Sequence, residues 1–186
     1  MNAPALRPAV VADAPRITEL MRASIRALFP RFYDERQTAS AVVHVGHLDL
    51  ALVQDGTYVV CEVGDELVAC GGWSRRNRLY AGSGDAPDDD RLLDPASEPA
   101  RVRAMFVRGD WTRRGLGRAI LEWCEDAARA EGFRELALMA TLPGEPLYRA
   151  WGFEEVERTL IVTPDGVELE GVAMRRPVRP PAPPAG

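Results

Sequence analysis

The clearest chemistry in the sequence gathers around Gly115-Leu116-Gly117, three residues that follow a predicted strand and begin a predicted helix. Glycines at such a turn let the backbone approach a ligand closely. The first amides of a helix have no helical partner, and the positive end of the helix dipole attracts anions. Arg113, Arg114 and Arg118 add cations beside these amides. The segment therefore predicts a site for phosphate.

Two common nucleotide loops do not fit this segment. A P-loop requires a lysine directly after its second glycine, and none follows Gly117. A dinucleotide-binding turn requires GxGxxG after the first strand of its unit, whereas residues 115–120 lack the third glycine and lie late in the chain. Two glycines alone can also form a simple tight turn. A third kind of loop, one that holds coenzyme A, needs support from elsewhere in the sequence.

That support comes from two segments that resemble motifs of the GNAT acetyltransferase family. Residues 105–121 resemble motif A, which comprises a strand, a phosphate loop and a helix. Residues 146–153, PLYRAWGF, resemble motif B, whose usual form is LYxxxGF. The resemblance extends from about residue 5 to residue 177. Thr112 departs from it, because the family usually has arginine or glutamine there, and this shifts the expected phosphate contacts to the amides of residues 113–118.

The resemblance implies that acetyl-CoA binds as co-substrate between two splayed parallel strands, residues 101–107 and 135–141. In the family, pantetheine lies along the first strand and the pyrophosphate lies on the loop that follows it. The residues assigned in this way to the co-substrate are Met105, Phe106, Val107, Thr112, Arg113, Arg114, Gly115, Leu116, Gly117 and Arg118. The resemblance implies no metal.

The resemblance also assigns chemical roles for the direct attack of a primary amine on the thioester. The amide of Val107 is expected to stabilise the oxyanion that forms, and Tyr148 to protonate the departing sulfur. The sequence does not identify a general base. The acceptor is expected to be a small-molecule amine or a peptide amine, bound by an aromatic wall of Phe29, Phe32, Tyr33 and Trp73.

Periodicity and turn signals predict the elements that must position these residues. The expected strands are residues 6–11, 57–63, 66–73, 101–107, 135–141, 154–162 and 167–174, and the expected helices follow Asp13, span 34–52 with a break at Gly46, and span 115–131 and 144–151. Strand, helix and strand from 101 to 141 predict a parallel pair with a right-handed crossover. The predicted fold class is α/β (α+β): one GNAT-like domain with a mixed, mostly antiparallel sheet, a central splayed parallel pair and helices on both faces.

Composition limits the remaining possibilities. The 186 residues suggest one domain, residues 1–177, with a proline-rich tail at 178–186 that is expected to be disordered. A net charge of −5 disfavours nucleic-acid binding. No apolar run approaches the ~20 residues that span a bilayer, and no signal core opens the chain, so no membrane association and a cytoplasmic location are expected. Three cysteines and two histidines show no convincing metal-ligand spacing, and residues 81–99 are expected to be a solvated loop.

Two other functions remain open from the sequence. One is a non-catalytic acyl-CoA-binding or sensory module on the same fold, which would bind CoA without reacting with any amine. The other is a Rossmann-like nucleotide binder, which would bind a dinucleotide and not CoA. The presence of Tyr148 favours the enzyme over the sensory module. Dimers are common in the family that the chain resembles, so a homodimer is compatible with it.

Overall fold

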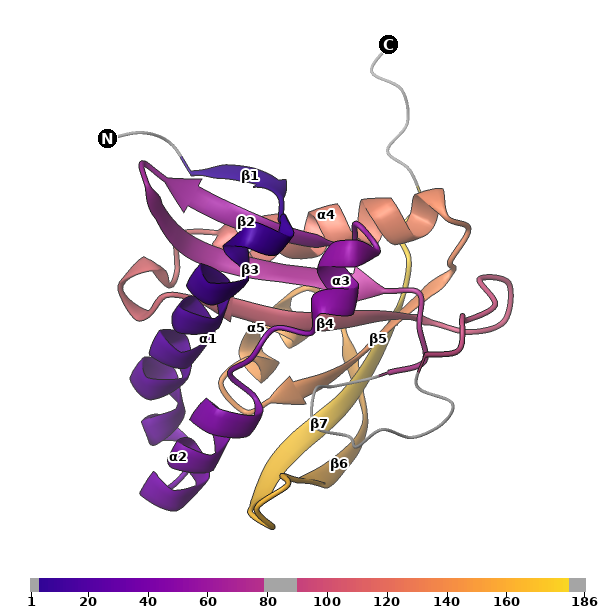
Figure 1. The fold of residues 1–186 in the computed structure, drawn as a ribbon. Helices are drawn as coiled ribbons and strands as arrows, with labels where there is room; N and C mark the ends of the chain where they lie inside the picture. Colours follow the sequence, from indigo (N-terminus) through magenta and orange to yellow (C-terminus); the bar gives the residue numbers. More distant parts are fainter. Residues whose placement is uncertain (1–3, 79–89, 181–186) are drawn as a thin grey trace.

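A seven-stranded sheet in the order β1-β2-β3-β4-β5-β7-β6 organises the computed structural model, which describes residues 4–78 and 90–180 (Figure 1). Its strands are β1 Ala5–Pro8, β2 Tyr58–Val63, β3 Glu66–Ser74, β4 Ala100–Val107, β5 Glu135–Thr141, β6 Glu154–Val162 and β7 Glu168–Pro177. Its α-helices are α1 Ala14–Leu28, α2 Glu35–His44, α3 Leu50–Gln54, α4 Leu116–Ala130 and α5 Glu145–Ala150. Only β4 and β5 pair in parallel, so the predicted mixed sheet is confirmed.

Local sequence signals explain where several helices begin and end. Asp34 caps α2, because its carboxylate accepts the Gln37 amide at 2.7 Å while the Gln37 side chain accepts the Asp34 amide. The predicted break at Gly46 is confirmed between α2 and α3, where a Cβ would lie 2.7 Å from the Val42 carbonyl oxygen. Gly132, with φ of +91°, follows α4 in the left-handed conformation that closes helices.

Helices cover both faces of the sheet, as predicted (Figure 1). On one face, α1 and α3 bury Ile17, Met21 and Leu52 against β2 and β3. On the other face, α4 buries Ile120 and Cys124 in the larger core cluster. The buried side chains of the central strands β2 and β3 therefore face a core on one side of the sheet or on the other.

The parallel pair of strands is short, and this opens the sheet. Only Ala100 and Arg101 of β4 pair with β5, opposite Leu136 and Ala137. Beyond these residues the two strands diverge, so within residues 4–78 and 90–180 no strand pairs with the rest of β4 on its β5 side. The crossover helix α4 connects the two strands, as the strand–helix–strand pattern predicts.

A bulge interrupts β4 at Ala104, whose φ is +51°. The hydroxyl of Tyr58 donates to the Ala104 carbonyl at 2.6 Å and holds the bulge from β2. On the other strand, Gly71 leaves room for it, since a Cβ there would lie 2.8 Å from the Met105 side chain. An extra residue in one strand rotates the side chains that follow.

The N-terminal boundary differs from the sequence prediction. The first strand is Ala5–Pro8 rather than residues 6–11, because residues 11–13 form a 3-10 turn. Asp13 precedes α1, but its side chain does not cap that helix. Instead its carboxylate accepts the Val10 amide at 2.9 Å and forms an ion pair with Arg7 at 2.8 Å.

Two predicted irregular segments are described only in part. Of the predicted loop, residues 81–89 lie outside the described residues, while in its remainder Leu93 is buried and Arg91 pairs with Glu98 at 2.8 Å. Arg179, in the predicted tail, donates to the buried Glu125 carboxylate, and its guanidinium lies 4.2 Å from the Trp151 ring centre. The domain therefore holds the chain at least to this residue, and residues 181–186 lie outside the description.

All three cysteines are buried and free. In residues 4–78 and 90–180, no group of three or more His, Cys, Asp or Glu residues is arranged to hold a metal ion. None of the helices in this described part of the chain is long and apolar enough to cross a membrane.

Candidate active site

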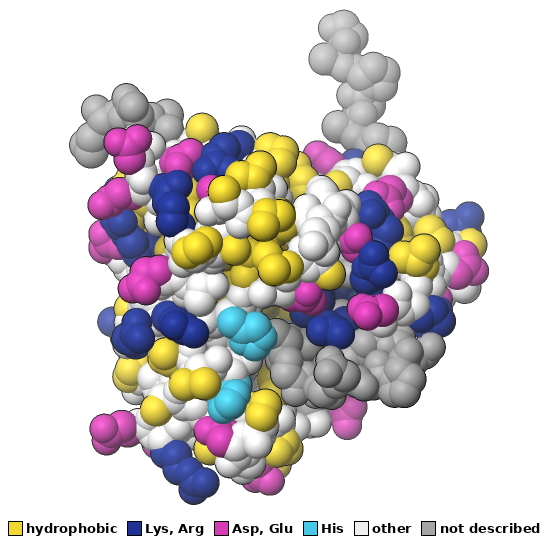
Figure 2. All heavy atoms as spheres, in the orientation of Figure 1, with side chains coloured by type: hydrophobic (Ala, Val, Ile, Leu, Met, Phe, Trp, Pro, Cys, Tyr) yellow, Lys and Arg dark blue, Asp and Glu magenta, His cyan; other side chains and the backbone are white. Residues whose placement is uncertain are grey.

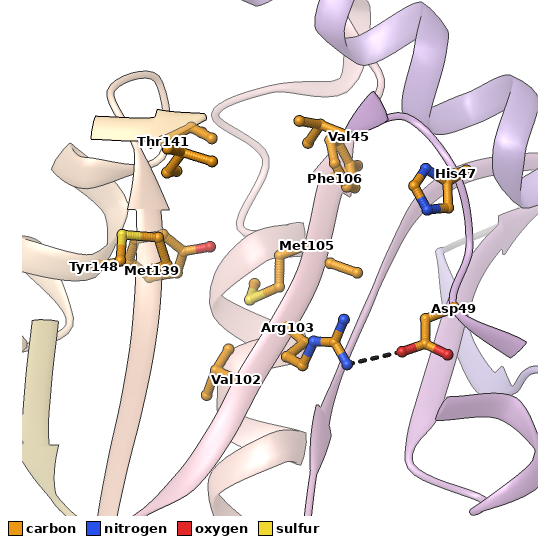
Figure 3. A pocket seen from close by; sticks show the side chains of 12 residues that line it. Val45, His47, Asp49, Val102, Arg103, Met105, Phe106, Met139, Thr141 and Tyr148 are labelled. Carbon is orange, nitrogen blue, oxygen red and sulfur yellow. Dashed lines mark hydrogen bonds and ion pairs between the residues drawn. The ribbon is translucent and has the colours of Figure 1, made fainter. Parts of the chain in front are cut away.

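A pocket of about 90 Å³ lies where β4 and β5 diverge (Figure 3). Its walls combine apolar side chains with a few polar ones, which is usual for small-molecule sites. The lining residues are Val45, His47, Asp49, Val102, Arg103, Ala104, Met105, Phe106, Met139, Thr141, Tyr148 and Ile161. Met105, Phe106 and Tyr148 among them were predicted from the sequence.

The main-chain groups of Val107 face away from β3. The Arg108 amide donates to the Val68 carbonyl at 2.9 Å, which makes the neighbouring pair, Val107 and Ala69, a non-hydrogen-bonded one. The Val107 amide and carbonyl therefore point to the open side of β4, where β5 has already diverged. The carbonyl accepts the Ser24 hydroxyl from α1 at 2.7 Å, which fixes the orientation of this strand end.

The predicted phosphate loop has the backbone that such a loop needs. Gly115 adopts φ of +82° directly before α4, and a Cβ there would meet nothing within 4 Å. The helix begins at Leu116, so the amides of Leu116, Gly117 and Arg118 lie in the first turn, where no carbonyl one turn earlier belongs to the helix. These amides point out of the helix start and form a ready site for an anion.

Gly117 has a different task from Gly115. A Cβ on Gly117 would lie 2.7 Å from the Cδ2 atom of Leu147. The absence of a side chain therefore lets α4 approach α5 closely, and α5 also carries Tyr148. One glycine shapes the loop, and the other couples the loop to the helix that bears the predicted acid.

The side chains around the loop are partly committed to contacts within the protein. Arg114 lies over the Trp111 ring, 4.4 Å from its centre, and donates to the Asp110 carbonyl at 3.3 Å. Arg118 lies 5.3 Å from the Trp151 ring centre. Thr112 donates its hydroxyl to the Gly109 carbonyl at 3.0 Å, so it braces the loop from within. The exposed Arg113 and Arg114 add positive charge outside the helix start.

Tyr148 is 9% exposed and packs edge-on against Phe153, with ring centres 5.9 Å apart. Its hydroxyl points across the gap between β5 and β4 toward Met105 (Figure 3). In the described part of the chain, this hydroxyl has no hydrogen-bond partner. Burial raises the pKa of the phenol above its usual value, so the side chain stays protonated at neutral pH. The arrangement suits a proton donor.

The structure adds three polar residues to the pocket that the sequence did not single out. Arg103 of β4 donates to the Asp49 carboxylate at 2.9 Å, and His47 lies beside them at the rim. Both histidines of the chain show on this face of the molecule (Figure 2). Burial lowers the pKa of His47 below its usual value, although the neighbouring Asp49 carboxylate opposes the shift, so the neutral imidazole is favoured at pH 7. The sequence signal that could have found Arg103 is its charge, which it shares with Arg101, in a strand whose other residues are apolar.

The four aromatic residues predicted for the acceptor wall do not line this pocket. Phe29, Tyr33 and Trp73 are 4%, 6% and 1% exposed and belong to the core clusters. Tyr33 also accepts the Leu142 amide and donates to the Glu170 carbonyl, which gives it a structural role. Phe32 is 47% exposed near the end of α1. Their part in acceptor binding therefore stays a prediction, with no support from the pocket geometry.

Comparison with known proteins identifies the class. The model of the acetyltransferase (GNAT) family matches residues 18–153. This chain therefore belongs to the GNAT acetyltransferase family, as the resemblance of its two motifs predicted. The match spans the whole of β2 to α5, including the phosphate loop and Tyr148.

Solved structures of the family share the fold. A GCN5-related N-acetyltransferase from Rhodopseudomonas palustris superposes with a TM-score of 0.69 at 21% identity, covering 95% of this chain and 97% of the other. The PaiA N-acetyltransferase from Thermoplasma acidophilum, in complex with coenzyme A, gives 0.63 at 12% identity, with 95% and 99% covered. A phosphinothricin acetyltransferase from Sinorhizobium meliloti, in complex with acetyl-CoA, gives 0.61 at 23% identity, with 95% and 89% covered. No curated protein sequence matches this chain.

Proposed function

We propose that this protein is an N-acetyltransferase that moves an acetyl group from acetyl-CoA to a primary amine by direct attack in a ternary complex. The observation that carries the proposal is the divergence of β4 from β5: the Val107 main chain faces away from β3 at the end of β4, and Tyr148 lines the pocket between the two strands. Family membership and the phosphate loop before α4 support acetyl-CoA as the donor.

The loop fits the pyrophosphate of the donor. The left-handed Gly115 leaves open space where a side chain would stand, and the first-turn amides of α4 point into it. The free edge of β4 from Met105 to Val107 offers amides and carbonyls to an extended chain such as pantetheine. When bound, acetyl-CoA supplies a thioester carbonyl that an amine can attack.

The residues of this chain then have distinct tasks. As the amine nitrogen bonds to the acetyl carbon, the carbonyl oxygen gains negative charge and the Val107 amide donates a hydrogen bond to it. As the carbon–sulfur bond breaks, the electron pair stays on sulfur and Tyr148 donates the proton that gives the free thiol. The attacking amine loses one proton in the same reaction. Solvent carries a proton back to Tyr148, so that no net proton is gained or lost.

His47 is the best-placed group to accept the proton of the incoming amine. It lines the pocket, and its lowered pKa keeps the imidazole neutral above the acidic range. Glu62 is a poor alternative, because its carboxylate is held by Arg7 at 2.9 Å and by Arg16 at 3.3 Å, outside the pocket. A base with a lowered pKa makes kcat/KM fall as the pH drops below neutral.

A His47→Gln variant tests this assignment. The wild-type profile of kcat/KM against pH should fall on the acidic side, and this limb should disappear in the variant while the rate at neutral pH drops. His44→Gln is the matched control, because His44 pairs with Asp165 at 3.5 Å and does not line the pocket. An unchanged pH profile in His47→Gln would remove this residue from proton transfer.

Two measurements test the function as a whole. Acetyl-CoA and CoA should raise the melting temperature, while NAD should not. Thiol release should then depend on both acetyl-CoA and an amine. Stabilisation by CoA without thiol release from any amine would identify a non-catalytic acyl-CoA-binding module instead. Stabilisation by NAD alone would refute the proposal in favour of a nucleotide binder.

A further inference from the structure

Arg103 is a buried cation with spare hydrogen-bonding capacity. Its side chain is 2% exposed and sits in the wall of the pocket (Figure 3). A guanidinium offers five N–H donors. In the described part of the chain, one of them is used, in the 2.9 Å bond to Asp49, while the buried Nε atom has no partner. Burying such donors without partners costs stability, so this arrangement calls for an explanation.

Asp49 does not accept hydrogen bonds from all the donors of the Arg103 guanidinium. Its carboxylate is shared, because Arg78 also approaches it at 3.9 Å. Asp49 accepts the Ala51 amide as well, since it caps α3 at its start. The pair therefore holds the guanidinium from one side, while the donors of its other terminal nitrogen turn away from Asp49 in the wall of the pocket (Figure 3). A second oxyanion in the pocket would complete their hydrogen bonding.

The other lining residues fit a small ligand that has both an apolar part and a charged group. Met105, Phe106, Met139 and Ile161 form apolar walls between Arg103 and the reaction end near Tyr148. Arg103 and Val107 are four residues apart on β4, so at ~3.3 Å per residue their Cα atoms lie at most ~13 Å apart. An acceptor that reacts beside Val107 can therefore reach the guanidinium with its own anionic end.

We infer that the acceptor is an amino acid or a closely related amino acid analogue, whose carboxylate or equivalent oxyanion is bound by Arg103 while its amine meets the thioester. This inference rests on the proposed function and names its substrate class. It disfavours polyamines and simple alkylamines, which lack the anion.

Matched pairs of amines test the inference on the unmodified protein. L-leucine, L-methionine and 5-aminopentanoate are compared with L-leucinamide, L-methioninamide and 1-aminopentane in the thiol-release assay. For at least one pair, we expect kcat/KM to be about 10- to 100-fold higher for the acid, as bonds to a charged group give. For the α-amino acids, intrinsic reactivity runs the other way, because a neighbouring carboxylate favours the protonated, unreactive amine.

The outcomes separate the inference from the function on which it rests. If the uncharged members of every pair react as well as the acids, or better, the inference is overturned while acetyl transfer stands. If acetyl-CoA is never consumed, with these compounds or with a wider panel that includes polyamines and peptides, the proposed function fails as well.

Two variants connect the preference to the residue. Arg103→Lys keeps the charge but removes the planar fork, and Arg103→Gln with Asp49→Asn removes both charges so that neither is left buried alone. Both should raise KM for the acid about tenfold or more and reduce the ratio of kcat/KM for the acid to kcat/KM for its uncharged partner, measured within the same variant. Stabilisation by acetyl-CoA, measured for each variant, shows that the fold and the donor site persist.

Arg101→Lys is the matched control. Arg101 lies on the same strand and donates to Asn77 at 3.1 Å, but it does not line the pocket. The natural chain contains no lysine, so intact mass spectrometry can show whether either new lysine becomes acetylated. A preference for the acid that survives in both Arg103 variants would overturn the assignment of Arg103.

Discussion

Removing the hydroxyl of Tyr148 should separate catalysis from binding. The Tyr148→Phe variant keeps the ring that packs edge-on against Phe153. The hydroxyl has no partner within the described residues, so its loss should change the free energy of unfolding by less than about 1 kcal/mol. A general acid contributes about 10²- to 10⁴-fold to the rate, which corresponds to about 3–5 kcal/mol in the barrier. We therefore expect kcat to fall by at least 100-fold.

The assay is thiol release under saturating acetyl-CoA and amine, together with thermal melts. KM for acetyl-CoA and the stabilisation by acetyl-CoA should both stay within about twofold of wild type, because the ring and the phosphate loop are intact. A kcat close to wild type would refute the role of Tyr148 as proton donor. A variant that melts several degrees lower without acetyl-CoA would refute the claim that the hydroxyl is structurally idle.

Three further changes test other parts of the structure. Gly115→Ala should cost about 1–2 kcal/mol, as should Gly132→Ala, because both glycines have positive φ, but only Gly115→Ala should weaken stabilisation by acetyl-CoA in thermal melts. Glu125→Gln should lower the free energy of unfolding by about 3 kcal/mol in urea titrations, since this fully buried carboxylate accepts hydrogen bonds from three nitrogens of Arg179, one of them in the main chain; a change below 1 kcal/mol would contradict this. Asp13→Asn should cost about 1–2 kcal/mol at pH 7, and this difference should vanish as the pH falls from 4 toward 2. The hydrogen bond from Arg7 lowers the pKa of Asp13 in the folded protein to about 2. The stability that the Asp13 carboxylate contributes is therefore fully present above its unfolded pKa and is lost as the pH falls through its folded pKa. A difference that stays constant with pH would exclude this pair as the cause.

Most of the fold could be predicted because its signals are local. The continuous apolar run of residues 136–140 marked β5, whose predicted bounds agree with the structure, and the turn that ends at Gly166 marked the β6–β7 hairpin. The phosphate loop was also visible, because a left-handed glycine before an amphipathic helix is a property of neighbouring residues. The two motifs then placed the loop in one family.

The acceptor end of the pocket could not be predicted, because it depends on contacts between distant segments. Arg103 and Asp49 are 54 positions apart and meet only through the bulge in β4 and the short helix α3. The aromatic residues chosen from the sequence failed to reach the pocket for a related reason, since Trp73 faces the α4 core at 1% exposure. Glu125 of α4 is likewise buried through a distant contact, since it accepts the main-chain amide of Arg179, 54 positions away.

The bulge at Ala104 divides β4 into two halves that can change independently. Before the bulge, Arg103 points to Asp49 on the α3 side, and after it Phe106 packs on that same side, while Met105 and Val107 contact the α4 core. Strict alternation would place Arg103, Met105 and Val107 together. Deleting one residue at this point would therefore move the side chains at the end of β4 to the opposite faces of the sheet. The acceptor end at Arg103 and the donor-binding edge at Val107 would both be lost. Substitutions on either side, in contrast, could alter acceptor choice during evolution while the donor-binding edge stays the same.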